Sequence, residues 1–174
     1  MDDYSRFEGL FIPTVTPFDA NGNLDLKSLD RVSRYQASIP GVAALKVLGA
    51  KRVALGTPYV SFINESEIKS LDDAGFKVVS MYGLEMGDNQ EERRGIARVP
   101  PQSLHRFASH IDRDDADAIF ISCTNIAGIE EIAEVEAERG KPVITSNSVT
   151  IWHALRTAGI NDKIEGFGRL LSEH

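Results

Sequence analysis

The stretch Asp117-Ala118-Ile119-Phe120-Ile121-Ser122-Cys123-Thr124-Asn125 decides the fold of this chain. Residues 116–122 form a short apolar run that is typical of a strand buried on both faces of a sheet. Polar residues follow the run, and residues 128–139 then show a helical pattern that stops at Gly140. A buried strand, a polar connection and a helix together indicate a parallel sheet that is covered by helices.

The same unit recurs along the chain from residue 51 onward. The predicted strands cover residues 52–56, 77–81, 116–122 and 142–145, and the predicted helices cover residues 61–74, 100–111, 128–139 and 148–158. A polar connection is predicted between residue 81 and Pro100. Because crossovers between parallel strands are right-handed, about four such units favour an α/β fold with a flavodoxin-like, doubly wound parallel sheet.

The first part of the chain has a different pattern. Residues 8–15 resemble a strand, residues 16–22 form a turn-rich loop, and residues 24–36 are helical in pattern. A second helix, over residues 40–48, follows without an intervening strand, which breaks the alternation. We therefore predict an N-terminal strand-loop-helix extension over residues 1–37 and an α/β domain over residues 38–174.

Composition excludes several classes of partner. The 174 residues carry 19 Lys+Arg against 26 Asp+Glu, a net charge of -7, and no basic stripe that would neutralise phosphates. The longest apolar stretches fall far short of the roughly 20 residues that span a bilayer. The acidic start, Met1-Asp2-Asp3-Tyr4, is unlike a signal peptide. We expect a cytoplasmic protein that binds neither nucleic acid nor membrane.

Small polar side chains gather where the predicted strands end. They are Tyr59, Asn89, Cys123 with Thr124 and Asn125, and Asn147. In doubly wound sheets ligands bind outside the carboxyl ends of the strands, so these residues are candidate ligand contacts. Tyr59 either donates its hydroxyl to a substrate oxygen or packs its ring at the surface. Each asparagine either binds a ligand or caps the helix that follows it.

Cys123 is the single cysteine of the chain. A thiol at a strand end, just before a helix, has its thiolate favoured by the helix dipole, and its pKa can fall well below about 8.5. The alternative is a small apolar side chain that fills a gap in the core. Its position among polar neighbours favours the reactive thiol.

Other titratable side chains do not form a metal-type pattern. The histidines, which are His105, His110, His153 and His174, lack metal-ligand spacing to one another, to Cys123 or to a carboxylate, so we interpret them as structural or solvated. The acidic run from Glu130 to Glu138 is interpreted as a solvated helix face. No metal site and no glycine-rich phosphate loop is predicted.

Several motifs in order resemble one known family. They are residues 51–59, 87–89, 98–101, 117–125, 142–147, 152–155 and 166–171. From about residue 38 onward the chain resembles the C-terminal half of maleate cis-trans isomerases and arylmalonate decarboxylases, which belong to the aspartate/glutamate racemase superfamily. The resemblance implies two similar α/β domains with the active site between them, no cofactor or metal, and cysteine chemistry on a small dicarboxylate.

The resemblance also implies roles for individual residues. Cys123 matches the cysteine of the C-terminal domain, Tyr59 and Asn89 match substrate contacts, and the Thr124 backbone helps to hold a carboxylate. Asn125 lies in the same motif as Cys123, and Asn147 lies in a matching motif with a weaker role. In isomerases and racemases of this family a second cysteine comes from the N-terminal domain, and this chain has none. Decarboxylase members use one cysteine.

Residues 7–36 resemble a second family. Phe7 to Asp19, with Gly22-Asn23-Leu24-Asp25, are similar to the opening of the dihydrodipicolinate synthase and N-acetylneuraminate lyase family. The Schiff-base lysine and catalytic tyrosine of that family lie much later in its barrel, so no catalytic residue carries over.

Four functions remain open from the sequence. The first is a cofactor-independent, maleate isomerase-like enzyme that uses the Cys123 thiolate. The second is decarboxylase-like or racemase proton transfer by one cysteine. The third is a catalytically inactive fusion or chimeric domain. The least favoured is a lyase that resembles dihydrodipicolinate synthase. Because an exposed half-site leaves apolar surface, we expect a homo-oligomer.

Overall fold

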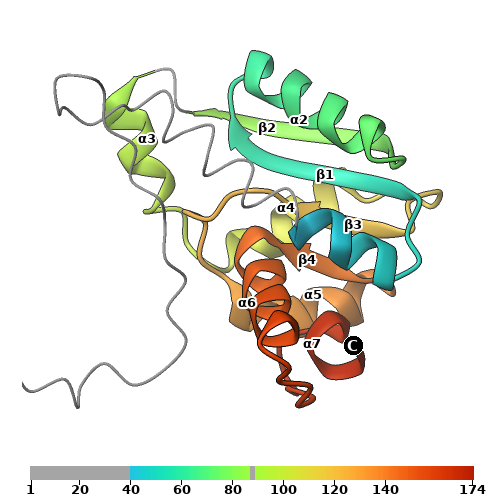
Figure 1. Cartoon of the computed structure of the whole chain (residues 1–174). Helices are drawn as coiled ribbons and strands as arrows, with labels where there is room; N and C mark the ends of the chain where they lie inside the picture. The colour runs from blue at the N-terminus through green and yellow to red at the C-terminus, as the bar shows by residue number, and fades with distance from the viewer. Residues whose placement is uncertain (1–39, 87–88) are drawn as a thin grey trace, which may run out of the picture. The chain divides into compact units, whose positions relative to one another are not determined.

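The computed structural model describes residues 40–86 and 89–174 (Figure 1). These residues belong to one compact unit of the chain, Ala37–His174. The predicted N-terminal extension, its boundary near residue 37 and the dipeptide Gly87-Asp88 lie outside the described residues, so the domain division stays a prediction. None of the helices in the described part has the length and apolar character that crossing a bilayer requires.

Four parallel strands form one sheet, as the sequence predicts. They are β1 Arg52–Tyr59, β2 Lys77–Met86, β3 Ala118–Ile121 and β4 Val143–Thr145, in the order β2-β1-β3-β4. All residues of β3 and β4 are buried, because helices cover both faces of the sheet. The parallel order and the alternation with helices confirm the flavodoxin-like, doubly wound fold.

The helices divide between the two faces. They are residues 40–47, α2 Ser61–Asp73, α3 Gln90–Ile96, α4 Ser103–Ile111, α5 Ile132–Arg139, α6 Ser146–Thr157 and α7 Arg169–Glu173, with a 3-10 turn η1 Ile129–Glu131 before α5. Apolar side chains of residues 40–47, α2, α6 and α7 pack on one face of the sheet. Those of α3, α4 and α5 pack on the other face.

Alternation along the strands explains this division. Val53 and Leu55 belong to one apolar cluster, whereas Ala54 between them belongs to the other. Successive side chains of a strand point to opposite faces, so each strand supplies both layers. The predicted inner face of α4 is confirmed, because all its members are buried: Leu104, Phe107, Ala108 and Ile111.

Several boundaries differ from the predicted ones. β1 and β2 run on to Tyr59 and Met86, because the two strands continue to pair beyond the apolar runs. The predicted polar connection contains α3, whose first turn is capped by Asn89. α6 starts at Ser146, two residues before the prediction, because Thr145 and Ser148 form a capping box across its first turn.

Glu136 corrects the interpretation of the acidic run as a solvated face. This side chain is 5% exposed, and its carboxylate accepts hydrogen bonds from the Val143 and Arg169 backbone N–H groups, both at 2.8 Å. Burial raises the pKa of Glu136 above its ordinary value, although the two backbone bonds act to lower it. The carboxylate thus joins α5 to β4 and to the start of α7.

Candidate active site

Three of the candidate residues lie at or just after the carboxyl ends of neighbouring strands. Tyr59 ends β1, Cys123 lies two residues after β3, and Asn147 lies two residues after β4. Because the strands are parallel and adjacent, these positions share one edge of the sheet. Ligands bind at this edge in doubly wound folds, which makes it the candidate active site.

Cys123 lies at the centre of this edge and is only 4% exposed. Its Sγ accepts a hydrogen bond from the Asn125 backbone N–H at 3.3 Å, and the Tyr59 side chain hydrogen-bonds the same thiol. Burial raises the pKa of the Cys123 thiol above its ordinary value. The hydrogen bonds from Tyr59 and from the Asn125 and Ile126 backbones act to lower that pKa.

The expected low pKa of Cys123 is therefore wrong for this structure. A turn rather than a helix follows Cys123, and the next helical residues begin with η1 at Ile129. Without a helix N-terminus at the sulfur, desolvation dominates. Burial therefore favours the protonated thiol, and donors already in place can stabilise a thiolate once it forms.

The end of β1 is held by a buried polar network that the sequence prediction missed. Thr57 Oγ1 donates to Asn64 Oδ1 at 2.5 Å, and Asn64 Nδ2 donates to the Tyr59 carbonyl oxygen at 2.9 Å. The Tyr59 N–H donates to Thr57 Oγ1 at 3.1 Å. One signal was available: Asn64 shares the inner face of its helix with Ile68 and Leu71, where an apolar residue is expected.

The other candidate residues have individual structural contacts. Asn89 Oδ1 accepts the Glu92 N–H at 3.0 Å, which is the capping alternative for this asparagine. Asn147 Nδ2 donates to the Ile126 carbonyl oxygen at 3.1 Å and so ties α6 to the turn after β3. Thr124 and Asn125 are exposed in that turn, on the chain segment that carries Cys123.

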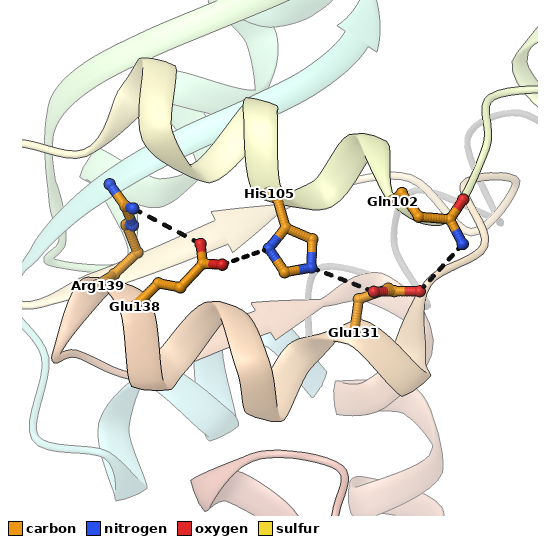
Figure 2. A network of polar contacts seen from close by, with 5 residues as sticks. All are labelled: Gln102, His105, Glu131, Glu138 and Arg139. Carbon is orange, nitrogen blue, oxygen red and sulfur yellow. Dashed lines mark hydrogen bonds and ion pairs between the residues drawn. The ribbon is translucent and has the colours of Figure 1, made fainter.

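A second polar cluster joins α4 to α5 (Figure 2). His105 Nδ1 lies 3.0 Å from Glu138 Oε1, and His105 Nε2 lies 3.1 Å from Glu131 Oε2. Glu134 also places a carboxylate oxygen near His105 and Glu131, so these three groups are possible metal ligands. Both ring nitrogens already face carboxylate acceptors, however, and the geometry is that of a bridging imidazolium.

The His105 bridge predicts a pH dependence of stability. Burial lowers the pKa of His105, but the hydrogen bonds to Glu131 and Glu138 outweigh it and raise the pKa above 6.5. The bridge therefore stabilises the fold fully below that ordinary value and loses its effect as the pH rises through the raised pKa. We expect His105→Gln to lower the free energy of unfolding by up to about 1 kcal/mol at about pH 6 and by much less at about pH 9.

Urea unfolding at the two pH values measures this difference. His153→Gln, on α6 and outside the bridge, is the matched control for the replacement of a histidine by glutamine. An effect of His105→Gln that is equal at both pH values would contradict the bridge.

Comparison with known proteins decides the family. Residues 32–171 match the arylmalonate decarboxylase family. The chain belongs to this family. Within the family, it is 32% identical over 132 residues to a maleate isomerase of Pseudomonas putida, covering 75% of this chain and 51% of the relative. It is 32% identical over 137 residues to the arylmalonate decarboxylase of Bordetella bronchiseptica, covering 74% and 53%.

Solved structures of the arylmalonate decarboxylase family share the fold. A maleate isomerase from Pseudomonas putida superposes with a TM-score of 0.72 at 28% identity, covering 84% of this chain and 61% of the other. An arylmalonate decarboxylase superposes with a TM-score of 0.71 at 28% identity, covering 85% and 68%. The chain spans about half the length of the curated relatives that it matches.

Proposed function

We propose that this chain acts on a small dicarboxylate as a cofactor-independent, maleate isomerase-like enzyme, with Cys123 as the nucleophile. The main support is the position of Cys123 in this member of the family. Its thiol lies at the carboxyl edge of the sheet and is hydrogen-bonded by Tyr59. The relatives support the substrate class. One of them, a maleate isomerase variant with a cysteine replaced by alanine, was crystallised with maleate.

The proposed reaction has three steps. The Cys123 thiol gives its proton to solvent water, and the thiolate adds to one alkene carbon of maleate while the π electrons move toward the carboxylate on the other alkene carbon. The central bond, now single, rotates. The delocalised pair then re-forms the double bond as the C–S bond breaks, the C–S electron pair returns to sulfur, and the trans acid leaves. Tyr59 and the Asn125 N–H stabilise the thiolate at the start and the end of this cycle.

A second candidate is decarboxylase-like proton transfer. It is favoured by the burial that raises the pKa of Cys123, because burial favours the protonated thiol that this reaction needs as its proton donor. In this reaction a malonate loses CO2, and Cys123 gives its proton to the carbanion that remains. The presence of one cysteine in the chain suits this one-thiol chemistry.

One assay separates these functions. The full chain is incubated with maleate or with phenylmalonate, and the products are followed by proton NMR. We expect fumarate from maleate, and Cys123→Ser should lower that rate at least about 100-fold, because the hydroxyl is a much weaker nucleophile and acid.

Each other outcome has a defined meaning. Phenylacetate formation without fumarate would favour the decarboxylase. Turnover that is indifferent to Cys123→Ser would contradict both reactions. No turnover of either acid would favour the inactive fusion or chimeric domain. A gain in the mass of the chain after borohydride treatment with pyruvate would instead support a lyase that resembles dihydrodipicolinate synthase.

A further inference from the structure

Asn64 is a fully buried polar side chain whose amide oxygen and amide nitrogen both form hydrogen bonds. Its oxygen accepts from Thr57 Oγ1 and its nitrogen donates to the Tyr59 carbonyl, so α2 is bonded to both sides of Pro58. A buried amide costs free energy unless it is satisfied, and here both partners belong to the end of β1. Asn64 therefore fixes the backbone from which the Tyr59 side chain extends.

The end of β1 needs this support because its pairing with β2 is irregular. Thr57 pairs with Gly83 and Tyr59 with Met86, so β2 carries one extra residue at this point. Such bulges re-aim the side chains of neighbouring residues. A Cβ at Gly83 would lie 2.5 Å from Asn64 Nδ2 and 2.6 Å from the Tyr59 carbonyl oxygen, so β2 is packed directly against the network.

We propose that Asn64 is a positioning residue that sets the reactivity of Cys123 by holding the Tyr59 hydroxyl on the thiol; its importance for turnover rests on the proposed function. The path runs from Asn64 through the Tyr59 backbone to the Tyr59 side chain and then to sulfur. The hydrogen bonds of the Asn64 side chain go to Thr57 and to the Tyr59 backbone, so Asn64 acts on the thiol through Tyr59.

This series of contacts explains how a buried thiol can still form a thiolate. Burial and the charge of Glu67 on α2 disfavour the thiolate, and the Tyr59 hydrogen bond opposes them. If Tyr59 turns away, burial acts with less opposition and the thiolate forms at higher pH. A general loosening of the edge has the opposite result, because water reaches the sulfur and the thiolate forms at lower pH.

The single cysteine makes the test direct. The rate of iodoacetamide alkylation of the full chain is measured as a function of pH. The alkylation midpoint, which is the pH at which this rate reaches half of its maximum, reports on Cys123 alone. We expect Asn64→Ala to raise the midpoint and to slow alkylation about three- to tenfold at about pH 8, the size of one lost hydrogen bond. Thr57→Val, which keeps the shape of a β-branched side chain, should shift the midpoint in the same direction if Asn64→Ala does not fold.

Two controls separate positioning from loss of structure. In a Tyr59→Phe background the Asn64 substitution should add no further shift, because the hydroxyl that it positions is gone. Leu71→Ala removes a buried side chain from the same helix without touching the network, and should leave the midpoint unchanged. An unchanged or lowered midpoint in Asn64→Ala and Thr57→Val, or an equal shift in the Tyr59→Phe background, would overturn the proposal.

These measurements use no substrate. A raised midpoint in a chain that turns over no acid would support the coupling between Asn64 and Cys123 while the proposed function fails. Turnover of maleate by a chain whose midpoint does not respond would support the proposed function and overturn the role of Asn64.

Discussion

Glu136→Ala is expected to lower the free energy of unfolding by about 2–3 kcal/mol. The carboxylate accepts the backbone N–H groups of Val143 and Arg169, and alanine leaves both without their partner. An unsatisfied buried donor costs about 1–3 kcal/mol, and the relief from burying a carboxylate offsets part of the sum. The effect is large because one side chain joins α5 to β4 and α7.

Urea denaturation at neutral pH measures the Glu136 effect. Glu134→Ala, on the exposed side of the same helix, is the matched control and should change stability by less than about 0.5 kcal/mol. Equal losses in the two variants would show that the buried hydrogen bonds do not matter. Glu136→Gln keeps one acceptor oxygen and should fall between Glu136→Ala and the unchanged chain.

Gly83→Ala is expected to destabilise the fold by about 1–3 kcal/mol, the cost of forcing an extra methyl group into a packed site. The new Cβ would lie 2.6 Å from the Tyr59 carbonyl oxygen, and a backbone atom cannot move aside cheaply. Either β2 shifts away from β1 or the bond between Asn64 and the Tyr59 carbonyl breaks. The second result would also raise the alkylation midpoint of Cys123.

Gly95→Ala is the matched control for Gly83→Ala. Its Cβ would lie 3.2 Å from the Met86 Cε, the far end of a flexible side chain, and the residue lies within α3. Alanine is favoured over glycine in a helix by about 1 kcal/mol, so this variant should be neutral or more stable. A Gly83→Ala protein as stable as the unchanged chain would contradict the tight packing of β2 against the network.

The parts of the fold that the sequence predicts are those with local signals. The strand before Cys123 is a continuous apolar run, and the inner face of α4 follows a helical period, so neither depends on distant residues for its recognition. The extension of β2 to Met86 is different, because pairing with β1 supports it where the apolar pattern has ended. The start of α3 also has a local signal, because Asn89 caps its first turn and capping is one of the two alternatives that the sequence leaves for this residue.

The candidate site divides in the same way. The edge with Tyr59 and Cys123 is predictable, because strand ends in a parallel sheet must meet. The raised pKa of Cys123 is not, since it depends on burial and on the turn that replaces the expected helix. The roles of Asn64 and Glu136 also require tertiary partners, which no spacing along the chain reveals.

Protection of Cys123 by maleate is the most direct test of a dicarboxylate site at this edge of the sheet. The full chain is alkylated with iodoacetamide, with and without maleate, and the labelled fraction is followed by intact mass. Sodium sulfate at equal ionic strength controls for a general salt effect. We expect maleate to slow labelling of Cys123 in a saturable manner, with half-protection at about 1 mM or below. Equal labelling rates in maleate and in sulfate, up to concentrations far above that value, would contradict the proposed site.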